Sequence, residues 1–336
     1  MARTNPHRPF VPDPAQMALR PPVSGNVING LGEPDRRPAS TVYWAPDPDD
    51  IPHGAMQKWF YTVDPGHPDF AVERAKRTRI NATPLPDVAA TSQDVGPDGW
   101  RQLWADLVQD ATCDAVGAAT MSDDWLFEGH TVDLPRIIVM AVQHDYDQIS
   151  TAPAAQAGAE VMRQYTRAAK AAMTLAARLR EMGWQSKPLT GPMAGAVAMI
   201  PAAIAAGLGE LGKHGSAIMP AFGSSFRLSA VLTDAPVPLD QPQVHGVDDF
   251  CASCRICEDA CPPEAILPEK QTVRGQEKWY VDFDRCLPFF NQHQGCAICI
   301  AVCPWSRPGV GLNLAQKYAR RTAGQSNGRN SSSTEA

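Results

Sequence analysis

The chain has 336 residues, enough for one large domain or two ordinary ones with a real hydrophobic core. Its content of 44% hydrophobic and 20% charged residues is ordinary for a soluble globular protein. The net charge of −6 argues against nucleic acid as the main partner, because nucleic-acid-binding proteins usually carry a strong basic excess.

The first part of the chain, residues 1–95, is rich in proline: 16 of the 31 prolines lie in the first hundred residues. Because each proline removes a backbone donor and fixes φ, we expect an irregular segment that wraps the rest of the chain. Aromatic residues in "TVYWAP" and "QKWFYTV" would hold it there. The N-terminus has no apolar stretch typical of a secretory signal, and the sequence after Arg36-Arg37 is too polar for an export signal. We therefore expect a cytoplasmic protein.

Three periodic segments follow. Residues 99–112 have helical spacing, with Trp100, Leu103, Trp104 and Leu107 on one face. The apolar run "RIIVMAV" at 136–142 predicts a strand buried on both faces. A long helix is predicted from 154 to 182, between Pro153 and Gly183. One side of this helix carries Val161, Tyr165, Ala168, Ala172 and Leu179.

The second half of the chain begins with a run of small residues, 194–212. Pro201 and two glycines interrupt it, so it predicts buried backbone and not a membrane span. The segment "SSFRLSAVLTD" alternates with period two and predicts a strand. Prolines at 236, 238 and 242 indicate a linker, and the tail 311–336, whose end lacks apolar residues, is expected to be disordered.

Eight of the nine cysteines form two runs after this linker. The first is Cys251-x2-Cys254-x2-Cys257-x3-Cys261-Pro, and the second is Cys286-x9-Cys296-x2-Cys299-x3-Cys303-Pro. The C-x2-C-x2-C-x3-C-P spacing is that of bacterial ferredoxins, in which the fourth cysteine of a run ligates the other cluster. One 4Fe–4S cluster is therefore assigned to Cys251, Cys254, Cys257 and Cys303, and the other to Cys286, Cys296, Cys299 and Cys261.

Two other uses of the cysteines compete with iron–sulfur ligation. Disulfides are disfavoured because a protein that is not exported keeps its thiols reduced. Structural zinc sites favour paired C-x2-C units over two C-x2-C-x3-C-P runs. Cys113 stands apart and is interpreted as a thiol with no role. A two-cluster module needs only about 60 residues, so residues 100–245 should hold whatever receives the electrons.

Five segments resemble one family in order and spacing. They are "IPAAIAAGLGELGKHG", "FGSSFRLSAVLTDAPVPLD", "DFCASCRICEDACPPEAI", "KWYVDFDRC" and "GCAICIAVCPW", and the resemblance as a whole covers about residues 130–310. The chain resembles the corrinoid- and iron–sulfur-dependent reductive dehalogenases, in their cytoplasmic, non-fused form. The resemblance implies an α+β architecture. A nitroreductase-like cobalamin-binding domain at 96–245 would precede a ferredoxin-like domain with two 4Fe–4S clusters at 246–310.

The resemblance also implies the partners. Base-off cobalamin would be the second cofactor beside the two clusters, an organohalide the substrate, and an external reduced ferredoxin or flavodoxin the electron donor. No nucleic acid and no membrane span are expected.

Family members place a tyrosine and a basic residue over the cobalt, which would be Tyr165 and Arg227 here. A guanidinium favours a phenolate, so a tyrosine beside it gives up its proton more readily to a carbon that gains electrons. Both residues also have ordinary interpretations, as a core tyrosine and a salt-bridged arginine. Gly207, Leu208 and Gly209 are candidate cobalamin contacts, because residues without bulk let backbone approach a flat macrocycle. Helix packing would explain them equally well.

Two alternatives remain open. The sibling family, epoxyqueuosine reductase, shares "AGLGxxGK"-like wording, but it has a longer insertion between the cysteine runs and an acidic catalytic residue where the helix here reads "RQYTRAA". Its phenylalanine in "GSWFFLGE" corresponds to Arg227 in "GSSFRLSA". The second alternative is a non-catalytic electron-transfer or corrinoid-reactivating protein.

Overall fold

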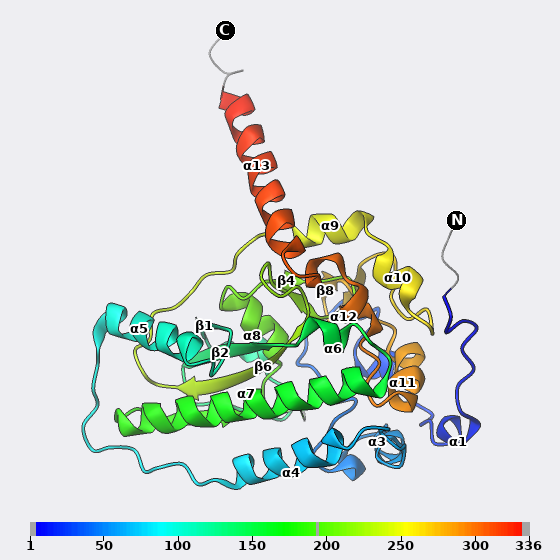
Figure 1. Cartoon of the computed structure of the whole chain (residues 1–336), viewed down its shortest axis with the longest axis horizontal. Helices are drawn as coiled ribbons and strands as arrows, with labels where there is room; N and C mark the ends of the chain where they lie inside the picture. Colours follow the sequence, from blue (N-terminus) through cyan, green and yellow to red (C-terminus); the bar gives the residue numbers. More distant parts are fainter. Residues whose placement is uncertain (1–4, 193–194, 331–336) are drawn as a thin grey trace.

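The computed structural model describes residues 5–192 and 195–330, with the backbone alone for 324–330. Residues 1–4 of the proline-rich segment and 331–336 of the predicted tail lie outside the described residues. A four-stranded antiparallel sheet with strand order β1-β2-β6-β3 occupies the middle of the molecule, and helices cover it (Figure 1). The architecture is α+β, as the sequence predicts.

Helices and strands alternate irregularly along the chain. The helices are α1 Pro14–Met17, α2 Gly25–Ile28, α3 Gly54–Phe60, α4 Asp69–Ala82, α5 Gly96–Gln109, α6 Tyr146–Ile149, α7 Ala155–Glu181, α8 Met199–Ala205, α9 Val247–Ser253, α10 Ile256–Ala260, α11 Phe283–Gln292, α12 Ile298–Val302 and α13 Val310–Asn330. The strands are β1 Ala115–Thr120, β2 Arg136–Gln143, β3 Ser186–Leu189, β4 Glu210–Leu211, β5 Ala217–Ile218, β6 Phe226–Thr233, β7 Gln271–Val273 and β8 Gln276–Lys278. Short 3₁₀ turns lie at Pro48–Asp50, Asp123–Trp125 and Pro304–Ser306.

The strand β2 is buried on both faces, which confirms the prediction for 136–142. Ile138 and Met140 belong to a core shared with α5 and α7, whereas Ile137 and Val139 belong to a second core under α8. Fully burying side chains of this size contributes about 1.5–3 kcal/mol each. The strand predicted around "SSFRLSAVLTD" is β6, and it pairs with β2 so that Val142 lies opposite Arg227.

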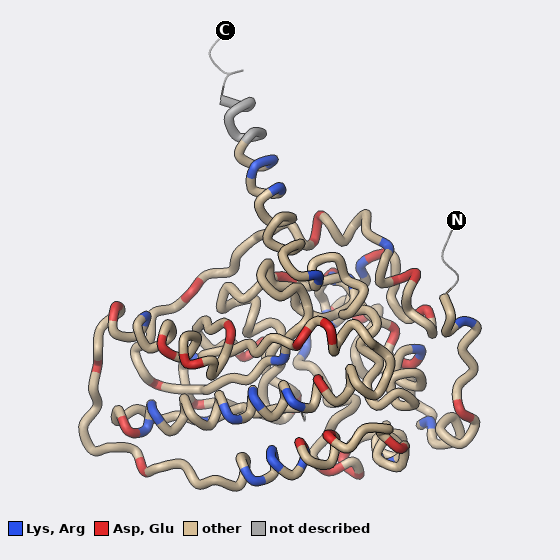
Figure 2. Tube along the Cα trace, viewed as in Figure 1, with Lys and Arg blue, Asp and Glu red and all other residues tan. Residues whose placement is uncertain are grey.

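The long helix α7 lies across one face of the sheet, and its bounds match the predicted 154–182. Ala168, Ala172 and Leu179 are fully buried in the first core, where small side chains let the helix pack closely. The helix ends before Gly183, whose φ of +84° suits the left-handed residue that closes a helix. The helix α4 packs against the other side of α7, and both carry many Lys and Arg residues (Figure 2).

The N-terminal segment is fastened to the cysteine-bearing end of the chain. Arg8 Nη2 donates to the carbonyl oxygen of Cys261 at 2.6 Å, and Tyr43 Oη donates to Asn291 Oδ1 at 2.7 Å. The expectation of an irregular segment is wrong for α4, because no proline interrupts the chain between residues 68 and 84.

The tail is helical where disorder was expected. Leu314 and Ala315 of α13 pack against a buried cluster that includes Trp305. The Tyr318 ring lies directly over Gly246, where a Cβ would come within 2.3 Å of it. The prediction of disorder was therefore wrong for Val310–Asn330, since the apolar residues at its start give the helix a surface to pack on. In the described part of the chain, no helix is long and apolar enough to cross a membrane.

Candidate functional site

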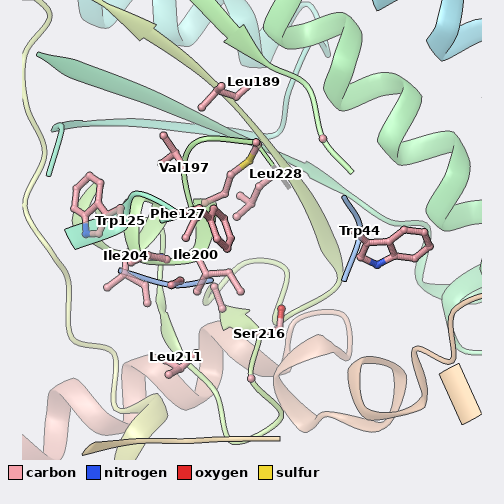
Figure 3. A pocket seen from close by; sticks show the side chains of 18 of the residues that line it. Trp44, Trp125, Phe127, Leu189, Val197, Ile200, Ile204, Leu211, Ser216 and Leu228 are labelled. Carbon is pink, nitrogen blue, oxygen red and sulfur yellow. The ribbon is translucent and has the colours of Figure 1, made fainter. Parts of the chain in front are cut away.

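A cavity of about 1410 Å³, here called the large cavity, lies where the ends of β3 and β6 meet α8 and the β7–β8 hairpin. Its wall contains aromatic side chains from distant segments, including Trp44, Trp125 and Phe127, which extend into it (Figure 3). Small-molecule pockets usually measure roughly 300–1,000 Å³. The large cavity therefore has room for more than one small ligand.

Tyr165 and Arg227 meet in the wall of the large cavity. Tyr165 comes from α7 and Arg227 from β6, and the guanidinium carbon lies 5.1 Å from the centre of the tyrosine ring. Arg227 Nη1 donates to the carbonyl oxygen of Phe226 at 3.2 Å. Its Nε is buried and has no hydrogen-bond partner in the described part of the chain. The arginine places its positive charge in the wall of the cavity.

A buried histidine lies behind Arg227. His144 is 2% exposed, and its Nδ1 is 3.5 Å from Ser225 Oγ. Burial, and secondarily the positive charge of Arg227, holds the pKa of His144 well below its usual range. The imidazole is therefore neutral at pH 7, and Arg227 remains the cation on this side of the cavity.

A second group of cations lies at the hairpin end of the large cavity, formed by Arg37, Arg274 and Lys278. Arg37 is paired with Glu33 at 2.7 Å. Burial and the like charge of Arg274 lower the pKa of Lys278 to about 8. Among the described residues no carboxylate forms an ion pair with Lys278. This end of the cavity is suited to an anion.

Four cysteines from both runs line a much smaller space, here called the thiol cavity. They are Cys251, Cys254, Cys257 and Cys303, and Lys213, His214, Phe250, Pro304 and Trp305 complete the wall. The fourth cysteine of the second run thus lies with the first three of the first run. The remaining four cysteines lie close enough that each thiol raises the pKa of at least one other. They are Cys261, Cys286, Cys296 and Cys299.

Burial strongly disfavours thiolates at these positions. It raises the pKa of Cys251 to about 11 and that of Cys257 to about 12, and neighbouring thiols add to the effect. A backbone N–H of Lys213 bonded to Cys251 acts in the opposite direction. In the second group, burial raises the pKa of Cys286 to about 12. None of the nine cysteines forms a disulfide. Four thiols around one space, three of them buried and that of Cys254 half-buried, fit a cationic iron–sulfur core, whose charge would stabilise their thiolates.

The loop 212–216, between β4 and β5, separates the two cavities. Gly215 and Ser216 line the large cavity, whereas Lys213 and His214 line the thiol cavity. Figure 3 shows Leu211 and Ser216 on the side of the large cavity. Electron transfer between groups held in the two cavities would therefore cross a single short loop.

The predicted cobalamin contacts are not among the residues that line the large cavity, and their role stays a prediction. Gly207, Leu208 and Gly209 lie outside the wall of the large cavity. A Cβ on Gly209 would come within 2.3 Å of the Ile218 carbonyl oxygen, and Leu208 is buried in the second core. Small residues that do line the cavity lie before and after them in the chain, at Gly195, Ala198, Gly215, Ser216 and Ala217.

Several cavity residues were not predicted. Trp44 was expected only to pin the N-terminal segment, and Arg274 and Lys278 were not considered. The pattern "TVRGQEKW" contained a signal, because Arg274 and Gly275 both have positive φ and form the tight turn of a hairpin. Cys113, interpreted as a thiol without a role, is fully buried in the first core.

Comparisons with known proteins give one match to a domain family and several to longer proteins. Residues 250–306 match the family model "4Fe-4S dicluster domain". Over 208 residues, 58% of this chain and 37% of the relative, the chain is 34% identical to tetrachloroethene reductive dehalogenase of Desulfitobacterium hafniense. Identity to the protein of the same name from Sulfurospirillum multivorans is 30% over 201 residues, 57% of this chain and 39% of the relative. Epoxyqueuosine reductase of Aliivibrio fischeri is 32% identical over 143 residues, 38% of this chain and 35% of the relative.

Solved structures of a reductive dehalogenase superpose on this chain. The catabolic reductive dehalogenase NpRdhA, as its K488Q variant, superposes with a TM-score of 0.66 at 25% identity, covering 77% of this chain and 40% of that one. The same enzyme with 3-bromo-4-hydroxybenzoic acid superposes with a TM-score of 0.62 at 24% identity, covering 81% of this chain and 40% of that one. The chain spans less than half the length of these relatives.

Proposed function

Because the chain is related in sequence and fold to the reductive dehalogenases, we propose that it is itself a cobalamin-dependent reductive dehalogenase. It would remove halide from an organohalide with electrons relayed through two 4Fe–4S clusters. The single observation that carries the proposal is the pairing of Tyr165 and Arg227 in a large cavity that one loop separates from four cysteines. The expected cytoplasmic location stays a prediction.

The residues of the large cavity fit a corrinoid. When bound, the corrinoid would supply the redox-active cobalt, and the clusters would supply single electrons. The small residues Gly195, Ala198, Gly215, Ser216 and Ala217 would lie against the flat macrocycle. Cobalamin carries a phosphodiester in its nucleotide tail, and Arg274 with Lys278 would hold that anion at the hairpin end.

Reductive dehalogenation needs two electrons and one proton. The carbon–halogen bond breaks, a carbon–hydrogen bond forms and the halogen leaves as halide. Tyr165 Oη would donate the proton to the carbon, which is general-acid catalysis. The guanidinium of Arg227, which lines the cavity, would hold the halide or an anionic group of the substrate. Trp44, Trp125 and Phe127 would exclude water and contact the rest of the substrate.

Two electrons must enter the chain from outside for each turnover. We assign this role to a separate reduced ferredoxin or flavodoxin, which would reduce the clusters one electron at a time. Each group of four cysteines would hold one cluster, with Cys303 in the first group and Cys261 in the second.

The test is halide release by the full chain, purified anaerobically and loaded with iron, sulfide and cobalamin. A panel of haloaromatic and haloaliphatic compounds would be offered with a chemical reductant. Release of halide together with the hydrogen-substituted product supports the proposal. Iron–sulfur absorbance without any corrinoid spectrum after loading would favour the electron-carrier alternative. Turnover of an epoxyqueuosine-containing RNA stem loop, without halide release, would favour the sibling activity.

A further inference from the structure

Two side chains in the wall of the thiol cavity have a buried ring nitrogen without a hydrogen-bond partner in the described part of the chain, Trp305 at Nε1 and His214 at Nε2. His214 lies on the loop 212–216 and is 7% exposed. The backbone N–H of Ser216 donates to His214 Nδ1 at 3.2 Å. Because Nδ1 accepts, the ring proton is on Nε2.

The Nε2–H of His214 has no acceptor. In the described part of the chain this atom is buried and forms no hydrogen bond, not even to a cysteine sulfur. A buried donor without a partner is destabilising, and such groups are rare in folded proteins. The ring lines the same small space as Cys251, Cys254, Cys257 and Cys303. An acceptor that occupies this space would satisfy it.

We propose that His214 Nε2–H donates a hydrogen bond to a sulfur atom of the iron–sulfur cluster held by Cys251, Cys254, Cys257 and Cys303, and thereby raises the reduction potential of that cluster. The inference rests on the proposed function in one respect, the presence of a cluster in the thiol cavity. No cysteine sulfur accepts from Nε2 in the described part of the chain, so the acceptor would be a sulfur of the bound cluster. His214 is a positioning residue, because it acts on electron transfer through the cluster.

The direction of the effect follows from charge. Reduction adds an electron to the cluster, and a hydrogen-bond donor stabilises the more negative state, which raises the potential. The neighbouring Lys213 is a weaker candidate for this role. Its Nζ is paired with Glu258 at 2.5 Å and donates to the Cys254 carbonyl oxygen at 3.0 Å, so its charge is already compensated.

The two clusters make an internal comparison possible. The reduction potentials of both would be measured by potentiometric titration followed by electron paramagnetic resonance, on the anaerobically loaded full chain. In His214→Leu, which removes the donor, one cluster should shift to a lower potential while the other keeps its value. In His214→Gln, whose amide can donate, the shift should be smaller. Iron content would be determined for each variant.

Two outcomes would overturn the inference. The first is a His214→Leu protein with full iron content and both potentials unchanged. The second is loss of iron from both variants alike, which would show that the ring only supports the fold of the loop. Activity is not the measured quantity, so the two claims fail separately. A protein that holds two clusters but releases no halide would contradict the proposed function and still allow the shift to be measured.

Discussion

The guanidinium carbon of Arg227 lies 5.1 Å from the centre of the Tyr165 ring, and both side chains line the large cavity. A cation over the face of a tyrosine holds the ring in place and orients its hydroxyl. The arrangement joins a potential proton donor to a potential anion site. The arrangement depends on the packing of α7 against β6, because Tyr165 comes from the helix and Arg227 from the strand.

Replacing Tyr165 with Phe should abolish most turnover and leave cofactor binding intact. General-acid catalysis typically contributes about 10²–10⁴-fold, so halide release should fall by at least about 100-fold. The corrinoid absorbance of the loaded variant should match that of the unmodified protein. Tyr146→Phe is the matched control, because Tyr146 packs against a separate cluster around Ile149. Full turnover in Tyr165→Phe would remove this residue from the mechanism.

Replacing Lys278 with Met should stabilise the protein in the absence of ligands. The pKa of Lys278 is lowered to about 8, so the unfolded chain binds its proton more tightly, and stability rises with pH between about 8 and 10.5. Below pH 8 the buried charge costs stability. After allowing for partial exposure, Lys278→Met should gain about 1 kcal/mol at pH 7 in urea unfolding. Lys270→Met, at a position paired with Asp248, is a control in which no gain is expected.

The same substitution tests the assignment of the hairpin end. Lys278→Met should weaken binding of cobalamin, measured by absorbance, by roughly tenfold, as expected for one lost charge-assisted hydrogen bond. Binding of cobinamide, which lacks the phosphodiester and nucleotide, should not change. Equal losses for both corrinoids would contradict a phosphate contact at Lys278.

Acid should destabilise the protein through His144. Its folded-state pKa lies below the usual 6.5 because of burial and Arg227, so the unfolded chain takes up the proton first. Stability is therefore retained above about pH 6.5 and is lost as the pH falls below it, by about 1.4 kcal/mol for each unit of difference in pKa. Urea unfolding at pH 7 and pH 5 should show a smaller difference in His144→Gln. An unchanged difference would mean that other groups dominate.

Removing the last cysteine of either run should affect the cluster of the other run. Cys303→Ser should change the signal of the cluster bound by Cys251, Cys254 and Cys257, and should lower the iron content from about eight per chain. Cys113→Ser is the control, since Cys113 lies in the first core, away from both groups. A change confined to the cluster bound by Cys286, Cys296 and Cys299 would contradict the assignment of Cys303 to the other cluster.

Local sequence patterns were enough to predict individual helices and strands. The expected cofactors and site residues came from the resemblance to a family. The periodicity of α7, the apolar run of β2 and the spacing of the cysteines could all be read directly from the sequence. The contacts of the cavity could not, because they join residues that share no local pattern. Trp44 reaches the cavity from a proline-rich segment, and Lys278 reaches it from a two-stranded hairpin. The role of Gly207 and Gly209 could not be read from the sequence, because a glycine allows backbone to approach backbone as readily as it allows backbone to approach a ligand.

The loop 212–216 forms part of the wall of both the large cavity and the thiol cavity. Gly215 has a φ of +77°, and a Cβ at this position would lie 3.2 Å from Val281 Cγ2. The loop therefore has little freedom to shift in one cavity without shifting in the other. Corrinoid absorbance, recorded beside the cluster potentials, would show whether a substitution in this loop, such as His214→Leu, disturbs the large cavity as well.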